Sequence, residues 1–253
     1  MPKSPPAFRA VTFLATFAVP LASLIALGCG ASSEELYDRG QASFKQGKLE
    51  PAVADLESFA LKTCGGAGGH QHCRQAYLTL GHAYEKREAP GKAWAAYDAA
   101  LTFGPHSGDE SIASDRDRMR DMLTAAQQKE TGRAPVIIRY RDEVTEEYTA
   151  RSVVISLDFA PIVTKDKDAG ELHSPDFRRL YSGSVSAGEH VLIVEMAHDC
   201  NPNGGAKCAR SRVHKAWPFI SVARTPATLE IRAFAESGEG DSPSRPALEL
   251  VSR

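Results

Sequence analysis

Small and aromatic residues recur at helical spacing between Tyr77 and Pro105, and they predict two helices packed side by side. They form one face of each helix: Leu80, Gly81 and Tyr84 in the first, and Ala93, Tyr97 and Ala100 in the second. Glycine and alanine allow two helix axes to approach closely, while tyrosine fills the space beside them. Pro90 and Gly91 separate the two helices, and Gly104 and Pro105 end the second one.

The same spacing occurs once more upstream. Aligning Gly40 with Gly81 places Leu56 opposite Tyr97, and Pro51 then lies in the first turn of a helix, where proline is tolerated. The two copies resemble the tetratricopeptide repeat, a helical hairpin of about 34 residues. The glycines are separated by about seven residues more than one repeat, and the Gly-rich stretch 64–73 accounts for the surplus as an inserted loop.

A charged helix is expected after the second copy. Its apolar residues recur at helical spacing and are Ile112, Met119, Met122 and Leu123. A pair of repeats leaves an apolar face open, and a helix with a polar outer side would close it. The helical domain is therefore expected over residues 34–130, before the polar stretch 127–135.

From Val136 the pattern changes to short runs rich in β-branched and aromatic residues. Seven such runs, separated by turn-prone stretches, predict an antiparallel β-sandwich over residues 136–253 and hence an α+β protein. The turn and strand at 186–194, together with 154–158, resemble the small PEGA-type sandwiches of bacterial envelope proteins.

The N-terminal 28 residues have the pattern of a secretory signal peptide. Lys3 and Arg9 precede an apolar run, and Pro20 within that run disfavours a membrane-spanning helix. The residues before Cys29 resemble a bacterial lipobox, which implies a lipid on Cys29 and a short linker at 29–33. The expected location is then the cell envelope, on the periplasmic side of the outer membrane. The alternative is ordinary secretion with cleavage nearby.

Cysteine spacing supports export to an oxidising compartment. With Cys29 lipidated, the other four form two local pairs, Cys64 with Cys73 and Cys200 with Cys208. Cys64 and Cys73, together with His70 and His72, are also a possible zinc or copper ligand set. The long Gly tract after Cys64 fits the usual ligand spacing poorly, so the disulfide is the favoured interpretation and no metal or cofactor is expected.

Charge and motifs exclude several functions. The formal net charge is −2, or about −4 without Lys3 and Arg9, and there is no basic stripe, so no nucleic-acid partner is expected. No metalloprotease, nucleotide-binding or nucleophile-elbow motif is present, and acidic clusters such as 236–241 are better explained as solvated turns than as calcium sites. The sequence therefore predicts a protein that is not an enzyme.

The resemblance to tetratricopeptide repeats implies a groove that binds a protein or peptide. It places the groove residues at fixed offsets from each glycine: Tyr37, Gln41, Phe44 and Lys45 in the first copy, and Leu78, His82, Glu85 and Lys86 in the second. Lys45 and Lys86 would then hold a carboxylate of the partner, although both fit a solvated helix face as well.

Two further hypotheses remain open. The sandwich is a candidate for glycan binding or for a structural role in the envelope if Tyr181, Trp217 and Phe219 form an exposed aromatic face. Burial of these aromatics in the core is the expected alternative. An enzyme with an unrecognised site in the sandwich is the third hypothesis, and no motif supports it.

Overall fold

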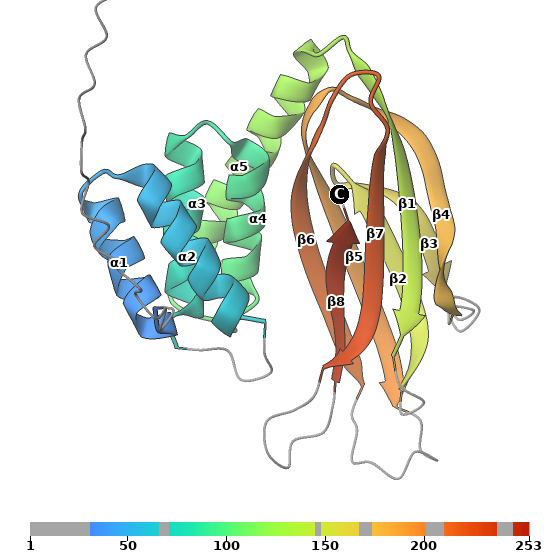
Figure 1. The fold of residues 1–253 in the computed structure, drawn as a ribbon, viewed down its shortest axis with the longest axis horizontal. Helices are drawn as coiled ribbons and strands as arrows, with labels where there is room; N and C mark the ends of the chain where they lie inside the picture. Colours follow the sequence, from blue (N-terminus) through green and yellow to red (C-terminus); the bar gives the residue numbers. More distant parts are fainter. Residues whose placement is uncertain are drawn as a thin grey trace, which may run out of the picture. The chain divides into compact units, whose positions relative to one another are not determined.

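The chain has an α+β fold, with helices in its N-terminal half and two four-stranded sheets in its C-terminal half (Figure 1). The computed structural model describes residues 31–65, 71–144, 148–166, 174–200, 210–236 and 245–252. The helices are α1 (Ser33–Lys45), α2 (Leu49–Thr63), α3 (Cys73–Lys86), α4 (Pro90–Leu101) and α5 (Asp109–Lys129). The strands are β1 (Arg133–Glu143), β2 (Tyr148–Leu157), β3 (Ala160–Asp166), β4 (Ser174–Ser186), β5 (Gly188–Cys200), β6 (Ser211–Ser221), β7 (Ala227–Glu236) and β8 (Arg245–Ser252).

Helices α1 to α4 form two helical hairpins, and local sequence signals explain where they begin and end. The Ser32 side chain accepts a hydrogen bond from the Glu35 amide, and the Glu35 carboxylate accepts one from the Ser32 amide, which is a capping box. Gly47 has a φ of 73° in the turn between α1 and α2, where glycine is the favoured residue. Pro90 is the first residue of α4.

In each hairpin a glycine faces a large side chain of the second helix. A Cβ atom on Gly40 would lie 2.6 Å from Leu56 Cγ, and one on Gly81 would lie 2.5 Å from Tyr97 Cε1. The glycine precedes its contact residue by the same number of positions in both hairpins. The aligned positions therefore have the same packing role, and only the absence of a side chain on the glycine permits this close approach.

Helix α5 packs on α4 through Ile112, Met119 and Leu123, which are buried. Met122 was also expected on this face, but it is 44% exposed, so that expectation was wrong. Consecutive residues of a helix differ by about 100° in direction, and a helix packed on one neighbour covers only part of its circumference. Leu123 occupies the covered part, and Met122 points elsewhere.

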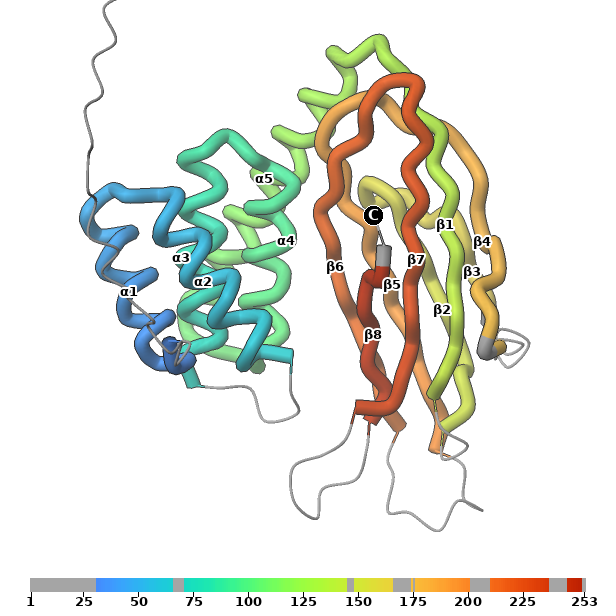
Figure 2. The backbone as a smooth tube through the Cα atoms, in the orientation of Figure 1, coloured from blue at the N-terminus to red at the C-terminus, as the bar shows by residue number. Residues whose placement is uncertain are grey.

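The strands form one sheet in the order β4-β1-β7-β8 and a second in the order β3-β2-β5-β6 (Figure 2). Alternate residues from both sheets point into a shared apolar core, as Ile138 and Leu229 of the first sheet and Ile155 and Val194 of the second illustrate. The arrangement is a β-sandwich, and the β5–β6 hairpin follows the turn at Gly188, which has a φ of 117°.

The strand prediction was incomplete in two respects. The structure adds β3 to the seven expected runs, and it pairs with β2. The sandwich is also not wholly antiparallel, since β1 and β7 run parallel, with Val136 opposite Ala227. Alternation of apolar and polar residues has the same period in parallel and antiparallel strands, so it gives no information on strand direction.

The helices and the sandwich belong to one compact unit, Ser32–Arg253. Helix α4 contacts α3 and α5 on the helical side and β5 and β6 on the sandwich side. Most of its residues, including Ala93 to Asp98, are therefore buried. Helix α5 ends at Lys129 and β1 begins at Arg133, so the chain changes from helix to strand within residues 127–135, where a domain boundary was expected. The division into two domains stays a prediction.

Replacing Gly81 by alanine should destabilise the protein. Alanine favours a helix by about 0.8–1 kcal/mol over glycine, but its methyl group would clash with the Tyr97 ring, which is fully buried and has no room to move. Overpacking of this kind costs about 1–3 kcal/mol, so a net loss of up to about 2 kcal/mol is expected in urea unfolding.

The control is Ala42→Gly at an exposed position of α1, which measures the propensity difference alone. If Gly81→Ala instead stabilised the protein by as much as Ala42→Gly destabilises it, the close approach of Gly81 to the Tyr97 ring would be contradicted.

Candidate functional site

The residues expected to line the groove all lie at the surface of α1 and α3. Lys45, His82 and Lys86 are exposed. The other five are partly buried: Tyr37, Gln41, Phe44, Leu78 and Glu85. None of the eight belongs to the buried core, so these positions are available for contact with a partner.

Two contacts bring the α1 and α3 residues together. The Gln41 amide donates to the Thr79 hydroxyl, with 3.0 Å between Nε2 and Oγ1. The Lys86 ammonium lies over the Phe44 ring, 4.8 Å from its centroid, which is within the range of a cation–π interaction. Lys86 is therefore held against α1. The Lys45 side chain forms no hydrogen bond or ion pair with the described residues, and Leu78 is partly buried.

A polar network joins α3, α4 and α5 at the same surface. The Tyr97 hydroxyl donates to Glu85 Oε2 at 3.0 Å and lies 2.8 Å from His82 Nδ1. Arg118 binds the same Glu85 carboxylate with both terminal nitrogens, at 2.8 and 2.9 Å. The hydrogen bond from Arg118 is the largest cause that lowers the pKa of Glu85, while burial, followed by Glu85 itself, raises the pKa of Tyr97. Glu85 is therefore held ionised and in place by groups from two other helices.

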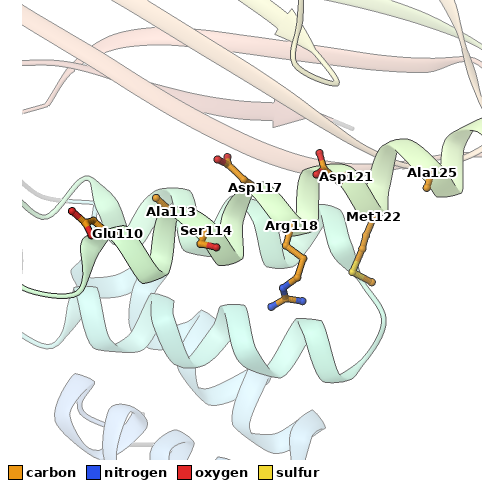
Figure 3. A pocket seen from close by; sticks show the side chains of 8 residues that line it. All are labelled: Glu110, Ala113, Ser114, Asp117, Arg118, Asp121, Met122 and Ala125. Atoms are coloured by element: carbon orange, nitrogen blue, oxygen red, sulfur yellow. The ribbon is translucent and has the colours of Figure 1, made fainter.

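Arg118 was not expected at this surface. It also binds Asp115 at 3.0 Å, and charged residues recur along the whole of α5, so the sequence gives no signal that separates Arg118 from its neighbours. Figure 3 shows Arg118 and Met122 projecting from one side of α5, whereas Asp117 and Asp121 project from the other.

A shallow depression of about 850 Å³ follows the outer face of α5. Residues of α5 line it: Glu110, Ala113, Ser114, Asp117, Arg118, Asp121, Met122 and Ala125. Because these residues all come from one helix, the depression lacks the enclosing walls of a small-molecule pocket.

Tyr37 is fixed by aromatic neighbours at the beginning of the hairpins. Its ring stacks on His72 with 4.3 Å between centroids and tilts against Phe59 at 5.3 Å. His72 in turn lies 3.2 Å from the Glu34 carboxylate. Burial, then the charges of Asp38 and Glu34, raise the pKa of Tyr37, so it is a neutral, positioned hydroxyl at ordinary pH.

Cys64 and Cys73 form the predicted disulfide, which links the end of α2 to the start of α3. Both sulfurs are therefore unavailable as thiolate ligands, and no group of three or more metal ligands occurs among the described residues. Cys200 is also disulfide-bonded, but Cys208, Cys29 and His70 lie outside the described residues.

The aromatic face proposed for the sandwich is not an exposed one. Phe219 is buried, and Tyr181 and Trp217 pack against the core. On the outer side of the β4–β1 pair, the guanidinium groups of Arg139 and Arg141 lie over the Phe177 ring, at 5.6 and 4.6 Å from its centroid. These aromatic side chains are therefore covered, and they do not provide an open stacking platform.

No protein-family model matches this sequence, and no curated protein is significantly similar to it. Within the described ranges, no helix combines the length and apolar character that crossing a bilayer requires.

Removing the Cys64–Cys73 disulfide should lower the free energy of unfolding by roughly 2–3 kcal/mol, because the closed loop of about ten residues restricts the unfolded chain. The measurement is urea unfolding of Cys64→Ala/Cys73→Ala against wild type, with peptide mass spectrometry of the unreduced protein to establish the link.

The control is the effect of a reductant, which should destabilise the wild type more than the double variant. Free thiols at both positions, with about one equivalent of zinc per chain, would contradict the disulfide and favour the metal site.

Proposed function

We propose that this protein is a non-enzymatic adaptor of the bacterial cell envelope. A lipid on Cys29 would anchor it to a membrane, and two helical hairpins of the tetratricopeptide type would present the α1–α3 surface to an extended segment of a protein partner. The sandwich would support the helices.

One observation carries the proposal, namely the recurrence of the same packing in both hairpins. Gly40 faces Leu56 and Gly81 faces Tyr97 at equivalent positions. In a repeat architecture, equivalent positions of successive units line one continuous surface. The eight expected groove residues occupy such equivalent positions, and all of them are accessible.

The chemistry of this surface favours a segment that combines apolar and acidic side chains. Tyr37, Phe44 and Leu78 offer partly exposed apolar area. Lys45 and Lys86 are exposed cations, whereas Arg118 is already bound to Glu85 and Asp115. The two lysines are therefore the groups that we expect to contact a carboxylate of the partner.

Charge reversal at both lysines should abolish partner capture with little effect on folding. Loss of a charge-assisted contact costs about 1.5–3 kcal/mol of affinity, which is roughly a 10- to 150-fold weakening. Loss of the exposed Lys86–Phe44 contact should cost only about 0.5–1 kcal/mol of stability. The measurement is crosslinking and pull-down from solubilised envelopes with Lys45→Glu/Lys86→Glu, followed by identification of the captured protein.

A matched control carries the same charge change elsewhere, Lys129→Glu/Lys165→Glu, at exposed positions of α5 and β3. It should capture the partner as the wild type does. Unchanged capture by the groove variant would refute binding through the α1–α3 surface. Equal loss of capture in both variants would show that the change in net charge, and not the position of the lysines, causes the loss.

The membrane anchor is tested separately, since Cys29 lies outside the described residues. Metabolic labelling with a fatty-acid analogue should mark the wild type, while Cys29→Ser should be unlabelled and soluble. The state of the Cys64–Cys73 disulfide in Cys29→Ser serves as a control for export. Equal labelling of both proteins would contradict lipidation at Cys29.

A further inference from the structure

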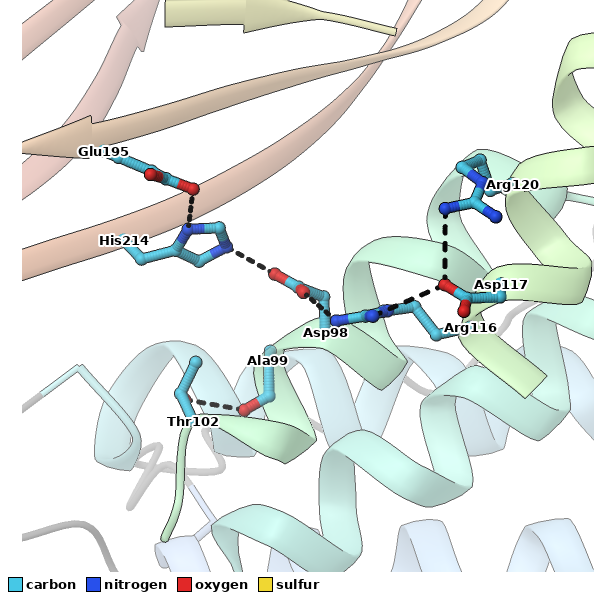
Figure 4. Close-up of polar contacts among 8 residues, drawn as sticks. All are labelled: Asp98, Ala99, Thr102, Arg116, Asp117, Arg120, Glu195 and His214. Atoms are coloured by element: carbon cyan, nitrogen blue, oxygen red, sulfur yellow. Dashed lines mark hydrogen bonds and ion pairs between the residues drawn. The ribbon is translucent and has the colours of Figure 1, made fainter. Parts of the chain in front are cut away.

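His214 of β6 lies at the junction between the sandwich and the helices, between two carboxylates. Its Nε2 atom is 2.6 Å from Asp98 Oδ2 of α4, and its Nδ1 atom is 3.3 Å from Glu195 Oε1 of β5 (Figure 4). A neutral imidazole has one N–H and one lone pair, so only the protonated ring donates to both carboxylates.

Asp98 is a buried carboxylate, with an exposed fraction of 7%. Arg116 of α5 also binds it, with 3.2 Å between Nη1 and Oδ1, and Arg116 lies 3.4 Å from Asp117 as well. If His214 loses its proton, its contact with Asp98 is no longer an ion pair, and a ring lone pair then faces Asp98 or Glu195. A buried carboxylate depends strongly on such partners.

The other charged groups around His214 have partners of their own. Asp117 pairs with Arg120 at 3.6 Å. Lys215 follows His214 on β6, and burial, opposed by the charge of Glu236, lowers its pKa. The charged groups that connect with His214 at the junction are Asp98, Arg116, Asp117, Arg120 and Glu195. Lys215, with Glu236 and Arg245 near it, lies on the opposite face of β6, because successive residues of a strand point to opposite faces.

His214 is half-buried, whereas His190 is buried and serves mainly the sandwich itself. Its Nδ1 atom is 2.6 Å from Asp158 and its Nε2 atom is 2.9 Å from the Ser186 carbonyl oxygen. Gln127 of α5 lies 3.2 Å from Nδ1 and donates to the Glu189 carbonyl oxygen at 3.0 Å. Of the two histidines, His214 is therefore the one that forms an ion pair between the helices and the sandwich.

Other contacts across this junction are uncharged or involve the backbone. The Trp94 and Phe159 rings meet edge to face at 4.9 Å, the Lys92 amide donates to Glu189 Oε1 at 2.9 Å, and α4 packs on β5 and β6. Among the described residues, Asp98 and His214 form the one ion pair between the helices and the sandwich. We propose that the Asp98–His214–Glu195 contact is a proton-dependent latch, which holds the helices on the sandwich while His214 is protonated and loosens them when it is neutral.

The direction of the pH effect follows from the geometry. The hydrogen bond to Asp98 is the largest cause that raises the pKa of His214, and it outweighs the opposing effect of burial. The latch therefore stabilises the contact between helices and sandwich fully below the ordinary histidine pKa of about 6.5. This stabilisation is lost as pH rises through the higher pKa that His214 has in the folded protein. Burial is the largest single cause acting on the pKa of His190 and lowers it, but Asp158, the Ser186 carbonyl and Glu189 together raise this pKa above its ordinary value. The pH dependence of His190 is therefore tested with a variant of its own. His198 titrates separately, because burial lowers its pKa to about 4.

Trp94 provides a reporter, because it is 6% exposed and lies at the junction. Trp217→Phe leaves Trp94 as the single tryptophan of the chain. Between pH 5.5 and 8.5, Trp94 emission should shift to longer wavelength and become more accessible to acrylamide, at constant far-UV circular dichroism. In the same background, His214→Gln should remove this pH dependence, and His190→Gln should retain it.

The control is His106→Gln, which replaces an exposed histidine between α4 and α5 and should titrate as the parent does. Asp98→Asn keeps the shape of the side chain, and it should move the Trp94 transition to lower pH. A Trp94 signal independent of pH in the parent, a transition unchanged by His214→Gln, or a transition lost in His190→Gln alone would each overturn the latch.

Discussion

The burial of α4 on almost every side is the constraint on which the rest of this structure depends. A helix surrounded by neighbours needs small side chains where other backbones approach, and α4 supplies Gly91, Ala93 and Ala96. The elements around α4 also need small residues at close contacts. Gly81 of α3 leaves space for the Tyr97 ring of α4, and a side chain on Gly91 of α4 would clash with Glu189 of β5. A substitution in α4 is therefore expected to change the packing of both the helices and the sandwich.

Two consecutive residues of α4, Tyr97 and Asp98, contact different parts of the protein. Tyr97 fills the space beside Gly81, and its hydroxyl reaches the network of His82, Glu85 and Arg118 on the candidate binding face. Asp98 points away from that face and binds His214 of the sandwich. The partners of the proposed groove and of the junction are therefore held by neighbouring side chains of one helix.

The sequence by itself determined the local features of this protein. Helical spacing, the glycines at 40 and 81 and the prolines at 51 and 90 were enough to place the hairpins, because helix geometry couples residues only three or four positions apart. The Cys64–Cys73 pair was predictable for a similar reason, since the two cysteines are separated by nine positions. The positions of the groove residues came from the resemblance to tetratricopeptide repeats, and their role in binding stays a prediction.

Tertiary structure alone decided the contacts between distant segments. The parallel pairing of β1 with β7, the partners of Arg118 and Asp98, and the exposure of Met122 all depend on which element packs against which. An alternating strand is compatible with either direction, and a charged residue on a helix is compatible with solvent as well as with a distant partner. His214 shows the reason most clearly: its spacing in β6 indicates only a half-buried strand position, and its two carboxylates come from α4 and β5 once the chain has folded.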